Sequence, residues 1–161
     1  MTRGNQRGFS LIEILVVFGV MTIAASFALL VSMDAYRSTN FRTERNMLVA
    51  LLERARSQAI NNYCLGTCTD GAPHGVAIRP IDNPDKYILY QGATYATRDT
   101  GADSVFDANP LVTSTGFSEV SFAQLSAVSS TVGGNTLTLS ETAGHSSVIT
   151  IGSEGQISWT N

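Results

Sequence analysis

Few side chains in this chain of 161 residues are of a kind that binds or reacts, and Glu13 is the most unusual of them. It is the one charged residue in the otherwise largely apolar residues 9–33. A carboxylate in a membrane costs about 2–3 kcal/mol at the centre of a helix and less near an interface. Such a carboxylate is a candidate functional group, and a cationic partner is expected for it.

The second candidate is a pair of cysteines, Cys64 and Cys68, within the Asn-, Gly- and Pro-containing residues 61–73. A C-x3-C pair suits half of a zinc site, a redox pair or a small disulfide. His74 is the only nearby imidazole and no second cysteine pair exists, so a full zinc set is not visible. If the segment lies outside the cytoplasm, a disulfide is favoured, and free thiols are the alternative.

Two further groups of polar residues are expected to be exposed to solvent. His74 and His145 are isolated in polar turns, which predicts solvated loop histidines. Asp99, Asp103 and Asp107 recur every four residues, a wider spacing than in a calcium loop and without its closing glutamate, so a solvated acidic loop is expected. The chain has no G-x-S-x-G, G-x-x-x-x-G-K or H-E-x-x-H motif. The sequence therefore indicates no enzyme and implies no cofactor and no metal.

The element that carries Glu13 is predicted to be a membrane-spanning helix. At about 1.5 Å per residue, residues 9–33 are long enough to cross a hydrocarbon core of roughly 30 Å. A cleaved secretory signal has a shorter apolar region of about 7–15 residues, although residues 24–26 (Ala-Ala-Ser) form a poor candidate cleavage site. A plain single-pass anchor explains the length and the flanking Arg3 and Arg7, but it does not explain Glu13.

Residues 8–17, Gly-Phe-Ser-Leu-Ile-Glu-Ile-Leu-Val-Val, resemble the class III signal of type IV pilins and of the pseudopilins of type II secretion. The resemblance implies that a prepilin peptidase removes residues 1–8 by cutting between Gly8 and Phe9 on the cytoplasmic side. It also implies that Phe9 is N-methylated and that Glu13 pairs with the amino terminus of a neighbouring subunit during assembly. The implied partners are other pilin or pseudopilin subunits, the peptidase and an inner-membrane assembly platform.

The physical chemistry of this N-terminus agrees with those roles. Arg3 and Arg7 would hold the uncleaved leader in the cytoplasm by the positive-inside rule, which leaves the C-terminal domain periplasmic or extracellular. After cleavage, the amine of Phe9 and the carboxylate of Glu13 would lie one helical turn apart, in the first turn, where the helix dipole favours an anion. Between subunits the same pair would remove two charges from lipid together and so favour one docking register.

Residues 34–62 are predicted to continue the helix, because no proline precedes Pro73 and apolar residues recur near the helical period. The expected apolar stripe is Phe41, Leu48, Leu51 or Leu52, Ala55 and Ala59. Glu53 and Arg56 form an i, i+3 pair. Residues 48–60 resemble the L-x-x-A-R-x-x-A-I stretch of the GspH/FimT group of minor pseudopilins and pilins, and residues 155–159 resemble the closing strand of that group. An amphipathic helix close to a sheet also explains the two alanines.

Residues 63–161 are predicted to form a β-rich globular domain. Strands are expected at residues 75–79, 86–91, 94–98, 117–122, 136–141, 147–151 and 156–160, in an antiparallel sheet. Residues 99–116 contain Asp, Gly, Asn and Pro and are expected to form a long surface loop. The residues expected to face the helix are Val76, Ile78, Ile88, Tyr90, Phe117, Phe122, Leu137, Leu139, Ile149, Ile151, Ile157 and Trp159.

The fold class is therefore α+β: a long N-terminal helix packed on a C-terminal antiparallel sheet, the pilin-like architecture that the resemblance implies. The net charge is −3, and loss of Arg3 and Arg7 would change it to −5. Residues 100–161 contain five acids and no Lys or Arg, which argues against a nucleic-acid partner. The expected function is that of a minor pilin or pseudopilin, a structural subunit of a filament. The alternatives are a pilin-like binding module that displays residues 99–116 to DNA or another surface, and a plain anchored β-domain.

Overall fold

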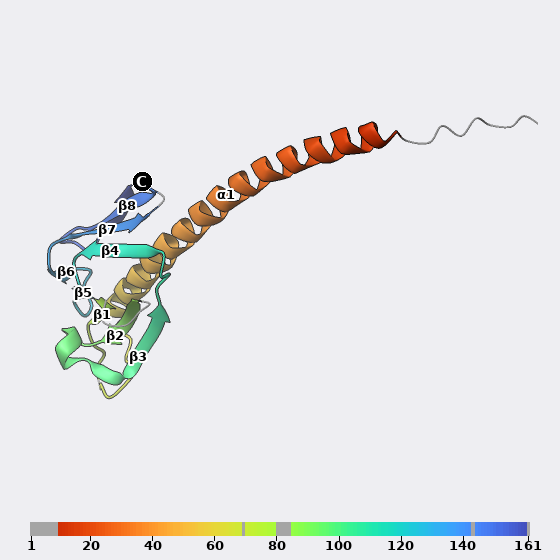
Figure 1. The fold of residues 1–161 in the computed structure, drawn as a ribbon. Coiled ribbons are helices and arrows are strands. Elements are labelled where there is room, and N and C mark those ends of the chain that lie inside the picture. Colours follow the sequence, from red (N-terminus) through yellow and green to blue (C-terminus); the bar gives the residue numbers. More distant parts are fainter. Residues whose placement is uncertain (1–9, 69, 80–84, 143, 161) are drawn as a thin grey trace, which may run out of the picture. The chain divides into compact units, whose positions relative to one another are not determined.

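The computed structural model describes residues 10–68, 70–79, 85–142 and 144–160 (Figure 1). The expected leader, residues 1–8, and its junction with Phe9 lie outside the described residues. The described chain folds into one long helix, α1 (Leu11–Ile60), one short 3-10 helix, η1 (Tyr95–Thr97), and nine strands. The α+β class predicted from the sequence is therefore confirmed.

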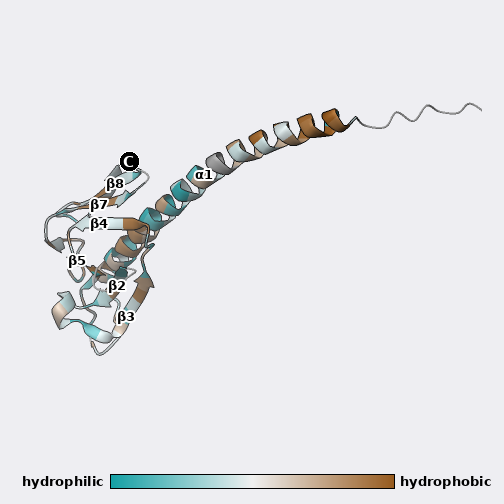
Figure 2. Cartoon of the chain, in the orientation of Figure 1, coloured by the Kyte–Doolittle hydropathy of each residue, from teal (hydrophilic) through white to brown (hydrophobic). Residues whose placement is uncertain are grey.

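The chain divides into two compact units, Met1–Ser38 and Thr39–Asn161. The first unit contains the N-terminal turns of α1, which Figure 2 shows as the most hydrophobic part of the helix. The second unit contains the rest of α1 and every described strand. The helix assignment continues from one unit into the next, so the predicted extension of the helix beyond Met33 is confirmed, and α1 ends two residues before the expected Asn62.

The C-terminus of α1 is closed by hydrogen bonds of the Schellman type. Asn62 adopts a left-handed conformation with φ of 55°. Its N–H donates to the carbonyl of Ala59 at 3.2 Å, and the N–H of Tyr63 donates to the carbonyl of Gln58 at 3.0 Å. Asn tolerates this conformation better than most residues other than glycine. The N–H of Leu125 also donates to Ala59, at 2.9 Å, so a distant loop helps to terminate the helix.

The strands form two antiparallel sheets rather than the single sheet that was expected. The five-stranded sheet has the order β3-β2-β1-β5-β6, and the four-stranded sheet has the order β4-β7-β8-β9. The first contains β1 (His74–Arg79), β2 (Lys86–Gln91), β3 (Asp99–Asp107), β5 (Glu119–Phe122) and β6 (Ser129–Val132). The second contains β4 (Val112–Gly116), β7 (Thr136–Glu141), β8 (Ser146–Ile151) and β9 (Ile157–Thr160).

One hydrophobic core joins the second unit's part of α1 to one face of each sheet. The predicted helical stripe is buried: Phe41, Leu48, Leu51, Leu52, Ala55 and Ala59. The sheets contribute the predicted residues Val76, Ile78, Phe122, Leu137, Leu139, Ile149 and Ile151, and Ile157 packs against them partly buried. The predicted Phe117, between β4 and β5, also joins this core. Full burial of one such aliphatic or aromatic side chain contributes about 1.5–3 kcal/mol. The helix is therefore held to both sheets mainly by apolar packing.

Two predicted core residues, Ile88 and Tyr90, face the opposite side of the five-stranded sheet. Side chains alternate along a strand, and it is Tyr87 and Leu89 that join the main core. Ile88 and Tyr90 instead form a small second cluster that Tyr95 covers. The expectation that both residues face the helix is therefore wrong.

The remaining differences concern edge strands and their neighbours. The expected strand at residues 94–98 is η1, which the side chain of Thr94 caps. The expected loop at residues 99–116 contains β3 and β4, and β6 was not predicted. Trp159 lies on edge strand β9 and is 47% exposed, so it is not a core residue. Edge strands are covered by neighbours less than central ones, so their sequences lack a strong apolar alternation and resemble loops.

Candidate functional site

Glu13 lies in the first turn of α1, on an exposed apolar surface. The helix starts where the carbonyl of Ser10 accepts hydrogen bonds from the N–H groups of Glu13 and Ile14, at 3.0 and 3.2 Å. With Ile14, Val17 and Phe18, Glu13 lines a surface groove of about 290 Å³. The spacing of these residues places them on one side of the helix. A carboxylate in this position is favoured by the helix dipole.

Two polar side chains that follow Glu13 in the apolar part of α1, Thr22 and Ser26, are satisfied locally. The hydroxyl of Thr22 donates to the carbonyl of Gly19 at 2.9 Å, and the hydroxyl of Ser26 donates to the carbonyl of Thr22 at 2.8 Å. Such bonds to the preceding turn remove the need for water in a membrane. The described residues include one helix long and apolar enough to cross a membrane, and its most apolar 18-residue window is not buried within the structure.

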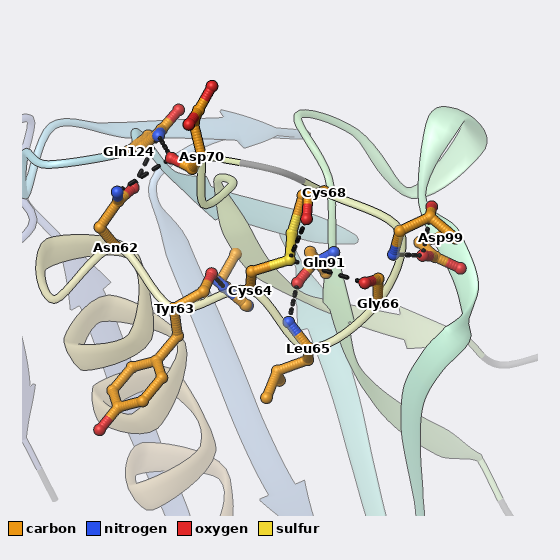
Figure 3. The surroundings of a disulfide bond; sticks show 12 residues. Asn62, Tyr63, Cys64, Leu65, Gly66, Cys68, Asp70, Gln91, Asp99 and Gln124 are labelled. Atoms are coloured by element: carbon orange, nitrogen blue, oxygen red, sulfur yellow. Dashed lines mark hydrogen bonds between the residues drawn. A yellow bond between two sulfur atoms is a disulfide. The ribbon is translucent and has the colours of Figure 1, made fainter.

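Cys64 and Cys68 are joined by a disulfide with 5.8 Å between their Cα atoms, as Figure 3 shows. The structure therefore supports the disulfide that the sequence favours for a segment outside the cytoplasm. The bond closes a small ring between the end of α1 and β1. Cys64 is exposed and Cys68 is half-buried.

The ring is attached to the first residue pair of the β2–β3 ladder, Gln91 and Asp99. The N–H of Leu65 donates to the side-chain carbonyl of Gln91 at 2.6 Å. The N–H and the hydroxyl of Thr67 both donate to one carboxylate oxygen of Asp99, at 2.8 and 2.9 Å. These bonds, the backbone one first, hold the pKa of Asp99 below its ordinary value. Gly66 passes so close to this carboxylate that a Cβ atom there would collide with it.

The far side of the same connection is fixed by amide side chains. Asn62 donates from its amide nitrogen to the carbonyl of Asp70 at 2.9 Å. Gln124 donates to the side-chain oxygen of Asn62 at 2.6 Å and also to the carbonyl of Asp70 (Figure 3). The connection from α1 to β1 is therefore tied to the loop after β5 as well as to β2 and β3.

The structure corrects the prediction of a solvated His74, because this side chain is fully buried. Its Nε2 lies 2.9 Å from the carbonyl of Tyr63, which can only accept, so Nε2 carries the proton. Burial lowers the pKa of His74, and the bond to Tyr63 offsets part of that effect. His145 is half-buried rather than solvated, with its ring centroid 6.0 Å from that of Phe41.

The three aspartates at residues 99–107 do not form a solvated acidic loop. Asp99 binds the disulfide ring, and Asp103 forms an ion pair with Arg98 in which the closest atoms are 2.7 Å apart. Arg98 in turn stacks on the ring of Tyr95, with its guanidinium carbon 3.7 Å from the ring centroid. Within the described ranges, no three His, Cys, Asp or Glu side chains lie close enough together to hold a metal ion.

Sequence reasoning identified Glu13 and the cysteines but missed Gln91, Asp99 and His74 as supports of the disulfide loop. No local pattern connects Thr67 to Asp99, which are 32 residues apart. The Gly8–Phe9 junction and the amine of Phe9 lie outside the described residues. Leader cleavage, N-methylation and the pairing of Glu13 therefore stay predictions.

Comparison with known proteins agrees with the N-terminal part of this description. Residues 3–29 match the family model of the prokaryotic N-terminal methylation motif, a signature of type IV pilins. Together with the long apolar helix and the antiparallel sheets, the match supports a place in the type IV pilin and pseudopilin family. The search of curated proteins and that of solved structures found no match. Proteins of this family are structural subunits, which assemble with other pilin subunits after processing by a prepilin peptidase.

Proposed function

We propose that this protein is a minor pilin or pseudopilin, incorporated into or initiating a type IV pilus or a type II secretion pseudopilus. The observation that carries the proposal is the methylation motif at residues 3–29, part of which lies on an exposed apolar helix. In this role the protein is a non-enzymatic part of a protein-secretion or pilus machine. Before assembly it sits in the inner membrane as a single-pass protein, with its C-terminal domain outside the cytoplasm.

Processing by prepilin peptidase forms the mature N-terminus in this proposal. The peptidase removes residues 1–8 by cutting between Gly8 and Phe9, and Phe9 is then N-methylated. The new amine is cationic and lies one helical turn from Glu13 by sequence spacing. An inner-membrane platform then inserts the processed subunit into the filament.

Glu13 is the assembly residue in this proposal. Its carboxylate is exposed on an apolar groove, where lipid surrounds it in the monomer. A neighbouring subunit's amine would pair with it and remove both charges from lipid together. Loss of one partner from a buried pair costs on the order of 3–5 kcal/mol, because the other charge is left unpaired. The pairing therefore selects one register of docking.

Mass spectrometry of the protein purified from membranes tests the processing. The expected N-terminus is Phe9, heavier by one methyl group. A retained leader in cells with an active prepilin peptidase, or a new N-terminus after Ser26, contradicts the proposal.

The assembly role is tested with Glu13→Leu, and Glu53→Leu is the matched control. Glu53 is on the same helix and forms only a surface pair with Arg56, 3.7 Å away, so its loss is expected to be nearly neutral. Glu13→Leu should be inserted and cleaved normally but should accumulate as a processed monomer in the inner membrane. Crosslinking to sister subunits and copurification with sheared filaments measure incorporation. Normal incorporation would mean that Glu13 is not the assembly residue or that the subunit is at the filament tip, where no subunit lies ahead of it.

The alternative function, display of residues 99–116 to DNA or a surface, rested on a long free loop. Those residues contain β3 and β4, and two of the three aspartates are bound within the structure. This segment therefore gives the alternative no specific support.

A further inference from the structure

We propose that the Cys64–Cys68 disulfide is a site of thiol–disulfide exchange with a dithiol oxidoreductase. Opening and closing of this bond would release and restore the contacts by which residues 64–68, which follow α1, bind Gln91 and Asp99 at the edge of β2 and β3. We call residues 64–68 with these contacts the latch. The inference rests on the exposure of the bond, on the small size of its ring and on what the ring holds. It concerns a different site from Glu13 and does not depend on the filament role.

The disulfide is accessible to an attacking thiolate. Cys64 and its neighbours Tyr63, Leu65 and Gly66 are exposed, whereas Cys68 is half-buried. Nucleophilic attack at a disulfide requires access to one sulfur along the S–S axis. Cys64 is therefore the sulfur that the reductant attacks. Exposed disulfides are in general more easily reduced than those within a core.

The ring is also too small to stabilise the whole domain strongly. A disulfide acts largely by restricting the unfolded chain, and the restriction grows with the number of residues that it encloses. Only three residues separate Cys64 from Cys68. The stabilisation that the disulfide gives to the folded state equals the amount by which folding disfavours reduction of the disulfide, because the two belong to one thermodynamic cycle. Since the first quantity is small here, the second is small as well. The bond can therefore open without unfolding the core.

What the ring stabilises is local and specific. The N–H of Leu65, within the ring, binds Gln91, as Figure 3 shows. The N–H of Thr67, also within the ring, binds Asp99, which pairs with Gln91 across β2 and β3. The second carboxylate oxygen of Asp99 accepts from the N–H of Gly101 at 3.0 Å. Asp99 thus couples the ring to the start of β3. The rest of the β2–β3 ladder pairs Lys86–Leu89 with Ser104–Asp107, farther along both strands from Gln91 and Asp99.

The exchange is balanced by a dithiol of the thioredoxin class. One thiolate of the dithiol attacks Sγ of Cys64, the S–S bond breaks, and Cys68 leaves as a thiolate that takes a proton from water. The second thiol of the dithiol, as a thiolate, then attacks the dithiol sulfur that is bonded to Cys64 in the mixed disulfide. Cys64 leaves as a thiolate and takes a proton from water. The protein gains two electrons and two protons as thiols, and the dithiol becomes a disulfide. Oxidation is the reverse reaction.

The experiment uses the full chain in detergent micelles, with dithiothreitol as the dithiol probe and no denaturant. Thiol alkylation measures opening of the bond, and amide hydrogen exchange measures the structure. On reduction, the amides of Leu65, Thr67 and Gly101 should exchange at least about tenfold faster, because their acceptors are no longer held in place. Amides of β7 and β8 should exchange at an unchanged rate.

Two variants distinguish a disulfide that controls only the local contacts of residues 64–68 from one that stabilises the whole domain. Asp99→Asn removes the charged acceptor, so it should speed up reduction by dithiothreitol; Asp107→Asn, at the other end of β3, is the matched control and should not. The double variant Cys64→Ser/Cys68→Ser should reproduce the exchange pattern of the reduced protein without any reductant.

Three results would overturn the proposal. The first is a bond that dithiothreitol opens only in denaturant. The second is a reduced protein with unchanged exchange at residues 65–67 and 99–101. The third is faster amide exchange across β7 and β8 as well, which would show that the disulfide stabilises the whole domain.

Discussion

Among single residues, His74 has the environment least expected from the sequence. It begins β1, is fully buried, and uses Nε2 to hold the carbonyl of Tyr63 beside the disulfide. Nδ1 is buried without a hydrogen-bond partner among the described residues. A proton added to Nδ1 would therefore place an unsatisfied positive charge in the interior. The neutral imidazole is the form that supports this loop.

The burial of His74 predicts that mild acid destabilises the domain. The lowered pKa of His74 means that the unfolded chain binds this proton more readily. The contribution of the histidine to stability is complete above its ordinary pKa of 6.5 and is lost as the pH falls through the lower folded-state value. Each unit of difference between the two pKa values corresponds to about 1.4 kcal/mol. Urea titrations of the full chain in micelles, between pH 7.5 and 5, measure the loss.

His74→Gln is the control for this prediction, since the amide nitrogen of Gln can still donate to the carbonyl of Tyr63 without titrating. The variant should show a flatter dependence of the free energy of unfolding on pH over the same range. The pKa of Asp99 is also lowered, from 3.8, so its effect begins only in more acidic solution. Equal slopes for the two proteins would show that another group carries the dependence.

Among the elements, β8 and β9 illustrate how position within a sheet decides the cost of a substitution. Ile149 and Trp159 are direct cross-strand partners, and partners in an antiparallel pair lie on the same face. Ile149 is on a strand with a neighbour on each side and is fully buried, whereas Trp159 is on the edge strand and is about half exposed. The larger side chain of the pair therefore contributes less buried area in proportion to its size.

This arrangement predicts that Ile149→Ala is the more destabilising of two truncations. Loss of a buried Ile leaves a cavity and should cost about 2–5 kcal/mol. Trp159→Ala should cost less than about 2 kcal/mol, because much of the ring is already in water and no closed cavity forms. Thermal unfolding followed by circular dichroism compares the two variants. A larger cost for Trp159→Ala would mean that its ring packs on the core.

At the scale of the whole molecule, the two units differ in how their apolar side chains are kept from water. The most apolar window of α1 has no buried residues within the structure, so it requires lipid or other subunits to cover it. The second unit has its own core, and every buried residue in that core lies between Phe41 and Ile151. Stability of the second unit therefore does not draw on the first.

A chain limited to Thr39–Asn161 is accordingly predicted to fold in water without detergent. It retains all of the core and the disulfide, so its thermal transition should lie within about 5 °C of the domain transition of the full chain. Circular dichroism and resistance to proteolysis provide the measurements. Aggregation of the reduced and oxidised forms alike, or a molten state that lacks a cooperative transition, would contradict an independent core.

The sequence alone determined the long helix, its buried stripe, Glu13 and the strands with clear alternation. These features depend on local periodicity: β2 and β7 were predicted with their observed bounds, and the stripe from Phe41 to Ala59 recurs near the helical period. The sequence favoured the disulfide on the condition that the segment lies outside the cytoplasm, and the structure contains this bond. The family resemblance depended on a contiguous motif, which the match at residues 3–29 supports.

Only the tertiary structure decided the edge strands and the surroundings of the disulfide. β3, β4 and β6 have polar sequences that resemble loops, and they become strands because a neighbouring strand satisfies their backbone groups. The burial of His74 and the contact of Asp99 with Thr67 depend on segments far apart in the sequence. No local pattern encodes such contacts, because they exist only once the sheets and the helix have packed together.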